Sequence, residues 1–269
     1  MIPSPGAELS DTPLPGDRSD APLPGGQGEP FFLVDRLPPA GPFVLDGPEG
    51  RHAATVRRLR AGESVVLTDG AGALAPATVA AAGRSELTLD VGLSRRVEPP
   101  AVRVILVQAL PKGERGELAV ELATEAGVDD IVPWVAQRCV ARWRSPDQVD
   151  KGVRRWRGTA REAAKQARRP FVPGVRDLAT TAQVADLAAG ATTLVLHESS
   201  VTPLTAADLP DAGDVVLIVG PEGGLTEEEL TVFGSAGAVV VRLGPQVLRT
   251  STAGAVALGA LGVLTGRWT

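Results

Sequence analysis

Two glycine-rich loops near the carboxyl end of the chain are the segments best suited to chemistry. Residues 220–224 read Gly-Pro-Glu-Gly-Gly and follow the apolar run 215–219, and residues 244–253 follow the apolar run 238–243. Glycines let backbone amides come close to a bound small molecule. Neither loop matches the phosphate-binding patterns G-x-x-x-x-G-K-S/T or G-x-G-x-x-G. The glycines therefore either close a tight turn between a strand and a helix or bring backbone amides to a small ligand, and the loops do not predict a phosphate nest.

The same loops carry the candidate catalytic side chains, Glu222, Arg249 and Ser251. Glu222 either contacts a bound molecule or interacts with the positive end of the helix that follows. Arg249 either forms a salt bridge, for instance with Glu222, or stabilises negative charge that develops on a substrate. Ser251 can exchange hydrogen bonds, but a serine cannot serve as a carboxylate base.

Each loop joins a predicted strand to a predicted helix. Thr226 and Glu229 have the T-x-x-E spacing of a capping box, which predicts that a helix begins there. From residue 102 onward strands and helices alternate, which predicts an α/β domain with a parallel sheet covered on both faces. The expected strands are 102–108, 130–134, 193–197, 215–219 and 238–243, and the expected helices are 114–126, 146–169 and about 252–264.

The last of these helices contains no charged residue and is apolar all round. A helix of that kind is buried, either in the core of its own domain or against a partner subunit, and the sequence pattern leaves both open. Thr252 is a candidate N-cap for it.

The chain divides into three segments by composition. Residues 1–29 are rich in proline and glycine and predict a flexible tail. Residues 30–96 contain short β-type runs (31–34, 43–45, 64–68 and 86–91) separated by turn residues, with helical spacing only around residues 52–59, and predict a small β-barrel domain. Residues 97–269 form the α/β domain.

Positive charge is concentrated although the net charge is −5. Residues 138–169 contain eleven Lys or Arg and three acids, and a second basic group surrounds residues 51–60. Such clusters attract phosphates, or they are solvated helix faces. As RNA contacts we expect His52, Arg57, Arg58, Arg138, Arg154, Arg155, Arg168 and Arg169; for His52, packing at the surface is the alternative.

Other features restrict the class of protein. The chain has a single cysteine, Cys139, and two histidines, which give no disulfide framework and no spaced cluster of metal ligands. No apolar segment is long enough to span a bilayer, and the N-terminus lacks the pattern of a secretory signal. We therefore expect a cytoplasmic protein without a metal or a membrane partner.

The two loops, GPEGGLTEEE and LGPQVLRTSTA, together resemble the signature loops of the SPOUT methyltransferases. The resemblance is closest to the subfamily that methylates N3 of a uridine in small-subunit (16S) ribosomal RNA. Three other segments, residues 51–60, 108–126 and 137–140, fit that subfamily in the same order. The resemblance therefore covers roughly residues 30–269. It implies a PUA-like RNA-binding barrel, a SPOUT-type parallel sheet with a trefoil knot, S-adenosylmethionine as cofactor, and a homodimer.

The resemblance also implies which residues meet the cofactor. Those expected to bind it are Leu196, Ile218, Gly220, Gly223, Gly224, Leu243, Val247, Leu248 and Ala253. Many relatives carry a glutamate where this chain has Ser251, so the acceptor of the N3 proton is open. A positive field from Arg249 is then the more attractive route to a deprotonated uridine. Two rival functions are a SPOUT ribose 2′-O methyltransferase and a non-enzymatic RNA-binding assembly factor.

Overall fold

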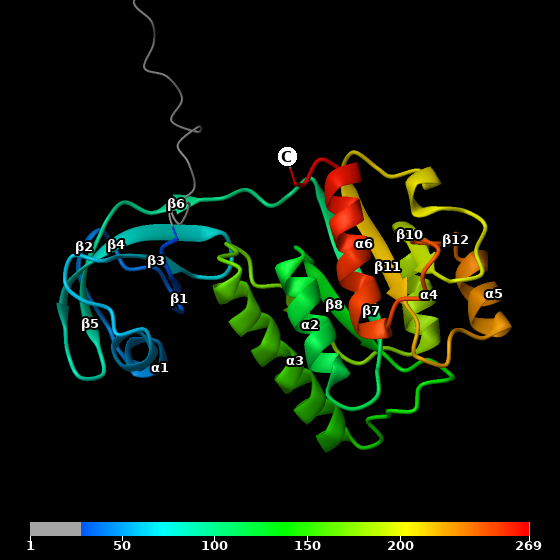
Figure 1. Ribbon diagram of the computed structural model, residues 1–269, viewed down its shortest axis with the longest axis horizontal. Coiled ribbons are helices and arrows are strands. Elements are labelled where there is room, and N and C mark those ends of the chain that lie inside the picture. Colours follow the sequence, from blue (N-terminus) through cyan, green and yellow to red (C-terminus); the bar gives the residue numbers. More distant parts are fainter. Residues whose placement is uncertain (1–27, 269) are drawn as a thin grey trace, which may run out of the picture.

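The computed structural model describes residues 28–268, which form a small β domain and a larger α/β domain (Figure 1). The prediction for residues 1–27 lies outside the described part. The small domain consists of β1 (Phe31–Leu33), β2 (Gly41–Leu45), α1 (Gly47–Arg51), the π-helical turn η2 (His52–Val56), β3 (Ser64–Thr68), β4 (Ala73–Ala82), β5 (Leu87–Val91) and β6 (Arg95–Arg96). All four β-type runs expected from the sequence are strands.

The strands of the small domain form one sheet in the order β1-β3-β4-β5-β2, with β6 paired to β4. β1 is parallel to β3, and the other pairs are antiparallel. Alternation places one side of the sheet in a core, because Leu87, Leu89 and Val91 are buried while Asp90 between them is exposed. The helical segment begins earlier than residue 52 because Pro48 starts a helical turn at Gly47.

The α/β domain follows the predicted alternation. It consists of β7 (Val102–Ala109), α2 (Arg115–Glu125), β8 (Asp130–Trp134), α3 (Pro146–Gln166), β9 (Gly174–Val175), α4 (Thr181–Ala189), β10 (Thr192–Leu196), the 3-10 turn η3 (Leu204–Ala206), β11 (Gly213–Val219), α5 (Glu227–Ser235), β12 (Val239–Val241) and α6 (Thr250–Leu264). The strand order is β12-β10-β11-β7-β8-β9, and every pair is parallel.

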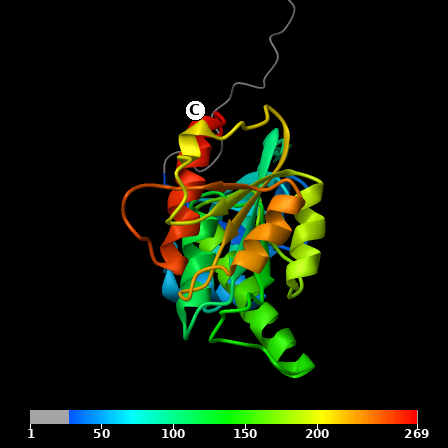
Figure 2. The same cartoon turned by 90° about the vertical axis from the view of Figure 1, so that its right-hand side faces the viewer.

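Helices cover both faces of this sheet (Figures 1 and 2). α2 and α6 pack together on one face with α3 beside α2, and α4 and α5 lie on the other face. The central strands are buried on both sides, as the apolar run 215–219 shows, since all five of its residues are less than 9% exposed. The predicted parallel α/β fold is confirmed.

The last helix, α6, is buried against its own domain along one side and exposes apolar side chains along another. Gly254, Leu258 and Leu261 are buried against the rest of the domain, whereas Val256, Val263 and Leu264 are 45%, 68% and 44% exposed. Thr252 is not its N-cap, because α6 begins at Thr250 with Arg249 in the cap position. No helix in the described part of the chain is long and apolar enough to cross a membrane.

The two domains meet at the carboxyl end of α3. Lys165 Nζ lies 2.8 Å from Glu49 Oε1, and both side chains are largely buried. After α3 the chain pairs with the small domain, since Gly72 N donates to Pro170 O and Val172 N donates to Gly70 O, at 2.9 and 2.8 Å. The basic helix α3 is therefore fixed to the small domain.

Candidate cofactor pocket and basic surface

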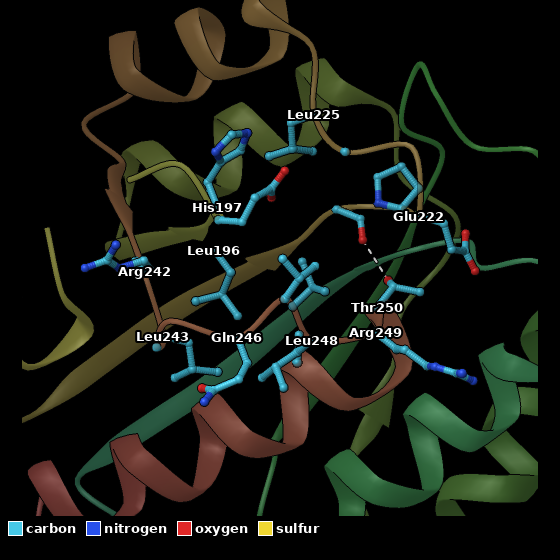
Figure 3. A pocket seen from close by; sticks show the side chains of 18 of the residues that line it. Leu196, His197, Glu222, Leu225, Arg242, Leu243, Gln246, Leu248, Arg249 and Thr250 are labelled. Atoms are coloured by element: carbon cyan, nitrogen blue, oxygen red, sulfur yellow. Dashed lines mark hydrogen bonds between the residues drawn. The ribbon is translucent and has the colours of Figure 1, made fainter. Parts of the chain in front are cut away.

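A cavity of about 320 Å³ lies at the carboxyl ends of β10, β11 and β12 (Figure 3). Both predicted loops line it: Gly220 and Glu222 come from the first loop, and Leu248 and Arg249 from the second. Ligands of parallel α/β sheets bind outside the carboxyl ends of the strands. The sequence therefore brings the two loops together at the edge of the sheet where a site is expected.

The first loop is held by its own turn and by the start of α5. Gly224 has φ +71°, a conformation that favours glycine, and its N–H donates to Pro221 O at 2.9 Å. The predicted capping box is present: Thr226 Oγ1 accepts from Glu229 N at 3.2 Å, and Glu229 Oε2 accepts from Thr226 N at 3.0 Å. Glu229 is fully buried, and its Oε1 accepts from Gln137 N at 2.7 Å. One carboxylate thus fixes α5 and the segment after β8.

Thr250 ties the second loop to the first and to β7. Its hydroxyl donates to Gly220 O at 2.7 Å and accepts from Gln108 Nε2 at 3.0 Å. Gln108 and Thr250 are buried, and a buried polar group that loses its partner is costly. This chain of hydrogen bonds therefore fixes three segments that lie far apart in the sequence.

The leucine walls of the pocket and two of its charged side chains lie on opposite sides (Figure 3). Leu196 and Leu243 lie on one side, where Arg242 also lines the pocket, whereas the side chains of Glu222 and Arg249 point to the opposite side, the charged end of the pocket. Glu222 Oε1 accepts from Lys112 N at 3.1 Å and lies 3.9 Å from Arg115 Nη1. The carboxylate thus pairs with Arg115 and not, among the described residues, with Arg249. Such a pocket suits a molecule with an apolar ring system and a charged tail.

Most of the residues expected at the cofactor line this pocket. They are Leu196, Gly220, Gly224, Leu243, Val247, Leu248 and Ala253, together with Glu222 and Arg249. Ile218 does not line it, because neighbouring strand residues point to opposite faces; Val219 lines the pocket and the Ile218 side chain is fully buried. Gly223 does not line it either. It packs against Arg138, and a Cβ added at 223 would lie 3.0 Å from the Cβ of Arg138. Ser251 is 3% exposed in the first turn of α6 and is also off the pocket.

Several residues that sequence reasoning missed also line the pocket: Arg115, His197, Glu198, Arg242, Gln246 and Thr250. His197 and Glu198 follow β10 directly, and Arg242 follows β12. The rule that sites lie at the carboxyl ends of parallel strands would have found these three. Arg115 comes from the first turn of α2 and gives no such signal.

Three of the predicted RNA contacts come together where the domains meet. His52, Arg57 and Arg168 line a hollow of about 110 Å³ between the small domain and the end of α3. The His52 ring also packs edge-on against Phe32, with centroids 6.3 Å apart. Arg58 is exposed nearby, with φ 54°. Along α3, Arg154 and Arg155 are exposed, and Arg155 Nε lies 3.2 Å from Glu117 Oε1.

Arg138 and Arg169 lie apart from this surface. Arg138 holds the first loop through its guanidinium, which donates to backbone oxygens there. Arg169 is buried, donates to Thr124 O at 2.9 Å and lies 4.0 Å from Asp129. Burial lowers the pKa of Arg169 to about 10, because a charged group is disfavoured away from water. Both guanidiniums therefore hold other segments of the protein in place.

Comparison with known proteins agrees with this geometry. The chain matches a family model for an RNA methyltransferase domain at residues 98–262, and one for an RNA methyltransferase PUA domain at residues 45–92. It is 54% identical over 246 residues to ribosomal RNA small subunit methyltransferase E of Mycobacterium tuberculosis, covering 88% of this chain and 93% of that one.

Solved structures of similar proteins have the same fold. The crystal structure of ribosomal RNA small subunit methyltransferase E from Neisseria gonorrhoeae, bound to S-adenosyl methionine, matches with a TM-score of 0.77 at 27% identity, covering 88% of this chain and 98% of that chain. A methyltransferase from Legionella pneumophila in complex with the same cofactor matches with a TM-score of 0.76 at 27% identity, covering 88% and 97%. The chain belongs to the RNA methyltransferase family, as a methyltransferase domain preceded by a PUA domain.

Proposed function

We propose that the protein methylates N3 of a specific uridine in the 16S ribosomal RNA of the small subunit, with S-adenosylmethionine as the methyl donor. The pocket carries this proposal, because two glycine-rich loops enclose a cavity with leucine walls on one side and the side chains of Glu222 and Arg249 on the other. The names of the relatives support the choice of RNA, and the cofactor bound in two solved structures supports the donor.

The pocket residues fit S-adenosylmethionine. The volume of the pocket, about 320 Å³, lies within the roughly 300–1,000 Å³ of small-molecule sites. Leu196, Leu243 and Leu248 provide walls for the adenine, and the charged end near Glu222 suits the methionine part. When bound, the cofactor supplies a methyl group on a positively charged sulfur.

Arg249 is the residue that we assign to the chemistry. Uridine N3 carries a proton and becomes a good nucleophile only when this proton is lost, so the reaction needs a base or a positive field that stabilises the anion. Ser251 is buried beside the pocket and is no carboxylate, whereas Arg249 is exposed at the charged end. The guanidinium stabilises negative charge on the uracil, and Ser251 contributes at most hydrogen bonds within α6.

RNA binds to the small domain and to α3. The hollow lined by His52, Arg57 and Arg168, together with the exposed Arg154 and Arg155, offers positive charge on one continuous unit, because α3 is fixed to the small domain. This arrangement supports binding through phosphates. The proposed place of action is the cytoplasm.

The same proposal includes a homodimer and a trefoil knot. The exposed apolar side chains of α6, Val256, Val263 and Leu264, support a subunit interface on this helix. A knot requires the start of α6 to lie against earlier segments of the chain, and Thr250 contacts β7 and the first loop. Val263→Glu should shift the protein to a monomer in analytical ultracentrifugation, and an unchanged mass would contradict the interface.

Mass spectrometry of nucleosides tests the proposed reaction. Small-subunit RNA from a strain that lacks the gene should lose N3-methyluridine at one site and regain it with the wild-type protein but not with Arg249→Ala. A lost 2′-O-methyl group would indicate the ribose methyltransferase instead. Calorimetry that detects no binding of S-adenosylmethionine would favour the assembly factor.

A further inference from the structure

A second hollow, of about 690 Å³, opens directly beside the cofactor pocket. The residues that line it are Lys112, Gly113, Glu114, Arg115, Leu118, Val140 and Glu222. Two of these, Arg115 and Glu222, also line the cofactor pocket. The pair therefore forms a partition between the two cavities. A molecule in the second hollow would approach the charged end of the cofactor pocket, to which Glu222 and Arg249 point (Figure 3).

The polar part of this hollow is held in place but remains accessible. Glu222 Oε1 accepts from the backbone N–H of Lys112 at 3.1 Å, which fixes the carboxylate at the partition. Arg115 Nη1 lies 3.9 Å from the same oxygen, and the two side chains are 42% and 31% exposed. An ion pair with this distance and exposure is weak. The Arg115 guanidinium can therefore contact another anion without leaving its position.

The apolar part of the hollow is unusual for an exposed surface. Leu118 is 42% and Val140 is 70% exposed. Leu118 points away from the core because α2 buries its other face, with Ala119, Val120 and Ala123. The lining carries two cations, Lys112 and Arg115, and two carboxylates, Glu114 and Glu222. Apolar side chains beside a guanidinium suit a flat, polar ring whose faces are apolar and whose edge becomes negative.

We propose that this second hollow receives the target uridine, and that Arg115 stabilises the uracil when N3 is deprotonated. The inference rests on the proposed function and adds a binding site and a catalytic residue to it. The N3 proton passes to water through the open side of the hollow. The N3 electron pair then forms the bond to the methyl carbon while the bond from this carbon to sulfur breaks. The electron pair of the broken carbon–sulfur bond stays on the sulfur, which thereby loses its positive charge.

The charges favour a uridine over a second copy of this chain in the hollow. A partner surface that covered Leu118 and Val140 would also remove Arg115 and Glu222 from water, which is costly for charges that are only loosely paired. A uridine anion instead supplies the negative charge that Arg115 lacks in close contact, and it brings the reacting atom to the wall shared with the cofactor pocket.

The first experiment separates chemistry from structure with an acidic substrate analogue. Single-turnover methylation is measured for wild type, Arg115→Ala and the control Arg103→Gln on small subunits assembled from RNA with uridine or with 5-fluorouridine. Arg103 lies near the amino end of β7, whereas the pocket lies at the carboxyl ends of the strands. Of its two partners, Asp130 keeps Arg176, and the pair with Asp214 is long, at 3.7 Å, and exposed. With uridine, Arg115→Ala should be about a hundredfold slower, with unchanged affinity for S-adenosylmethionine.

With 5-fluorouridine, whose N3 loses its proton more readily, the defect of Arg115→Ala should shrink at least tenfold relative to wild type, because less stabilisation is needed. An equal defect on both substrates would overturn the role of Arg115. Failure of the wild type to form N3-methyluridine would instead contradict the proposed function, so the two failures are distinguishable.

The second experiment fills the hollow. Val140→Trp should raise the RNA concentration for half-maximal rate at least tenfold and leave the affinity for S-adenosylmethionine unchanged. Val232→Trp is the matched control, since Val232 is 40% exposed on α5, across the sheet. An unchanged RNA dependence of Val140→Trp would overturn the uridine site. Dissociation of a dimer by this substitution would also overturn it and assign the hollow to a subunit interface.

Discussion

The guanidinium of Arg138 donates a hydrogen bond to the backbone carbonyl of Gly223, with Nη1 3.1 Å from the oxygen. The same nitrogen also donates to Leu225 O at 3.2 Å. The segment after β8 thus lies directly against the first glycine-rich loop. A glycine at 223 permits this close approach between two parts of the protein.

Gly223→Ala tests this close approach. A Cβ at 223 would lie 3.0 Å from Arg138 Cβ and 3.3 Å from Arg138 O, so one of the two segments must move. Overpacking of this kind costs roughly 1–3 kcal/mol. We expect affinity for S-adenosylmethionine, measured by calorimetry, to fall about tenfold or more, because 1.4 kcal/mol corresponds to a factor of about ten.

Gly234→Ala is the matched control, because an added Cβ there meets no atom within 4 Å. It should leave the affinity unchanged and raise helix stability slightly, by up to about 1 kcal/mol. Equal affinities of the two variants would show that the contact with Arg138 does not position the loop.

Thr250→Val removes the hydroxyl that joins Gly220 to Gln108. Two buried polar groups then lose a partner, and we expect the free energy of unfolding to fall by about 1–3 kcal/mol. Affinity for S-adenosylmethionine should fall as well, since Gly220 lines the pocket. Thr250→Ser keeps the hydroxyl and should restore the affinity. If serine is as damaging as valine in urea unfolding and calorimetry, the hydrogen bonds are not the cause.

Features that depend on neighbouring residues could be predicted from the sequence. The strand expected at residues 130–134 is β8 (Asp130–Trp134), and the capping box of Thr226 and Glu229 starts α5. Gly127, which follows the end of α2, has φ +93°, a conformation that favours glycine. In each case the signal is local, because apolar runs, capping residues and glycine act on the backbone around them.

Features that depend on distant residues could not be predicted in this way. Thr250 instead of Thr252 begins α6, and its hydroxyl bonds to Gly220, a residue on another strand end. The side of β11 that faces the pocket could not be inferred, because β11 is buried on both faces and its apolar run shows no alternation. Ile218 was therefore expected in the pocket, whose lining contains Val219 instead.

Neutralising Arg154 and Arg155 together, both to Gln, should weaken binding of small-subunit RNA and reduce its salt dependence. Each lost phosphate contact lowers the slope of log K against log salt by roughly 0.7–0.9, because fewer counterions are released. Arg155 also loses its pair with Glu117, but both side chains are partly exposed, so stability should change little. Arg103→Gln removes one positive charge near the amino end of β7, outside α3, and should leave RNA binding unchanged. An unaltered slope in the double variant would mean that this part of α3 is only a solvated face.

Stability at alkaline pH should depend on Cys139. Burial raises the pKa of the Cys139 thiol above its ordinary value of 9.0, because the thiolate is disfavoured away from water. Above about pH 9 the unfolded chain loses this proton while the folded protein keeps it, so the free energy of unfolding falls as pH rises. Cys139→Ala should show a smaller fall between about pH 8 and 10 in urea unfolding. Parallel curves for the two proteins would contradict the raised pKa.

Arg249→Ala and Ser251→Ala should differ strongly in their effect on methyl transfer. Arg249 is exposed at the charged end of the pocket, where it can act on charge that develops in the uracil, whereas Ser251 is 3% exposed within α6. Loss of one such electrostatic contact costs about 2.7–4 kcal/mol, or roughly a hundred- to a thousandfold in rate. The net value of one neutral hydrogen bond is about 1 kcal/mol, so Ser251→Ala should slow the reaction no more than about tenfold. Both variants should bind S-adenosylmethionine with affinities close to that of the wild type, because the contact is made in the transition state. Single-turnover methylation of small-subunit RNA, with cofactor binding measured by calorimetry, decides the matter: a normal rate for Arg249→Ala, or a larger defect for Ser251→Ala, would remove Arg249 from the chemistry.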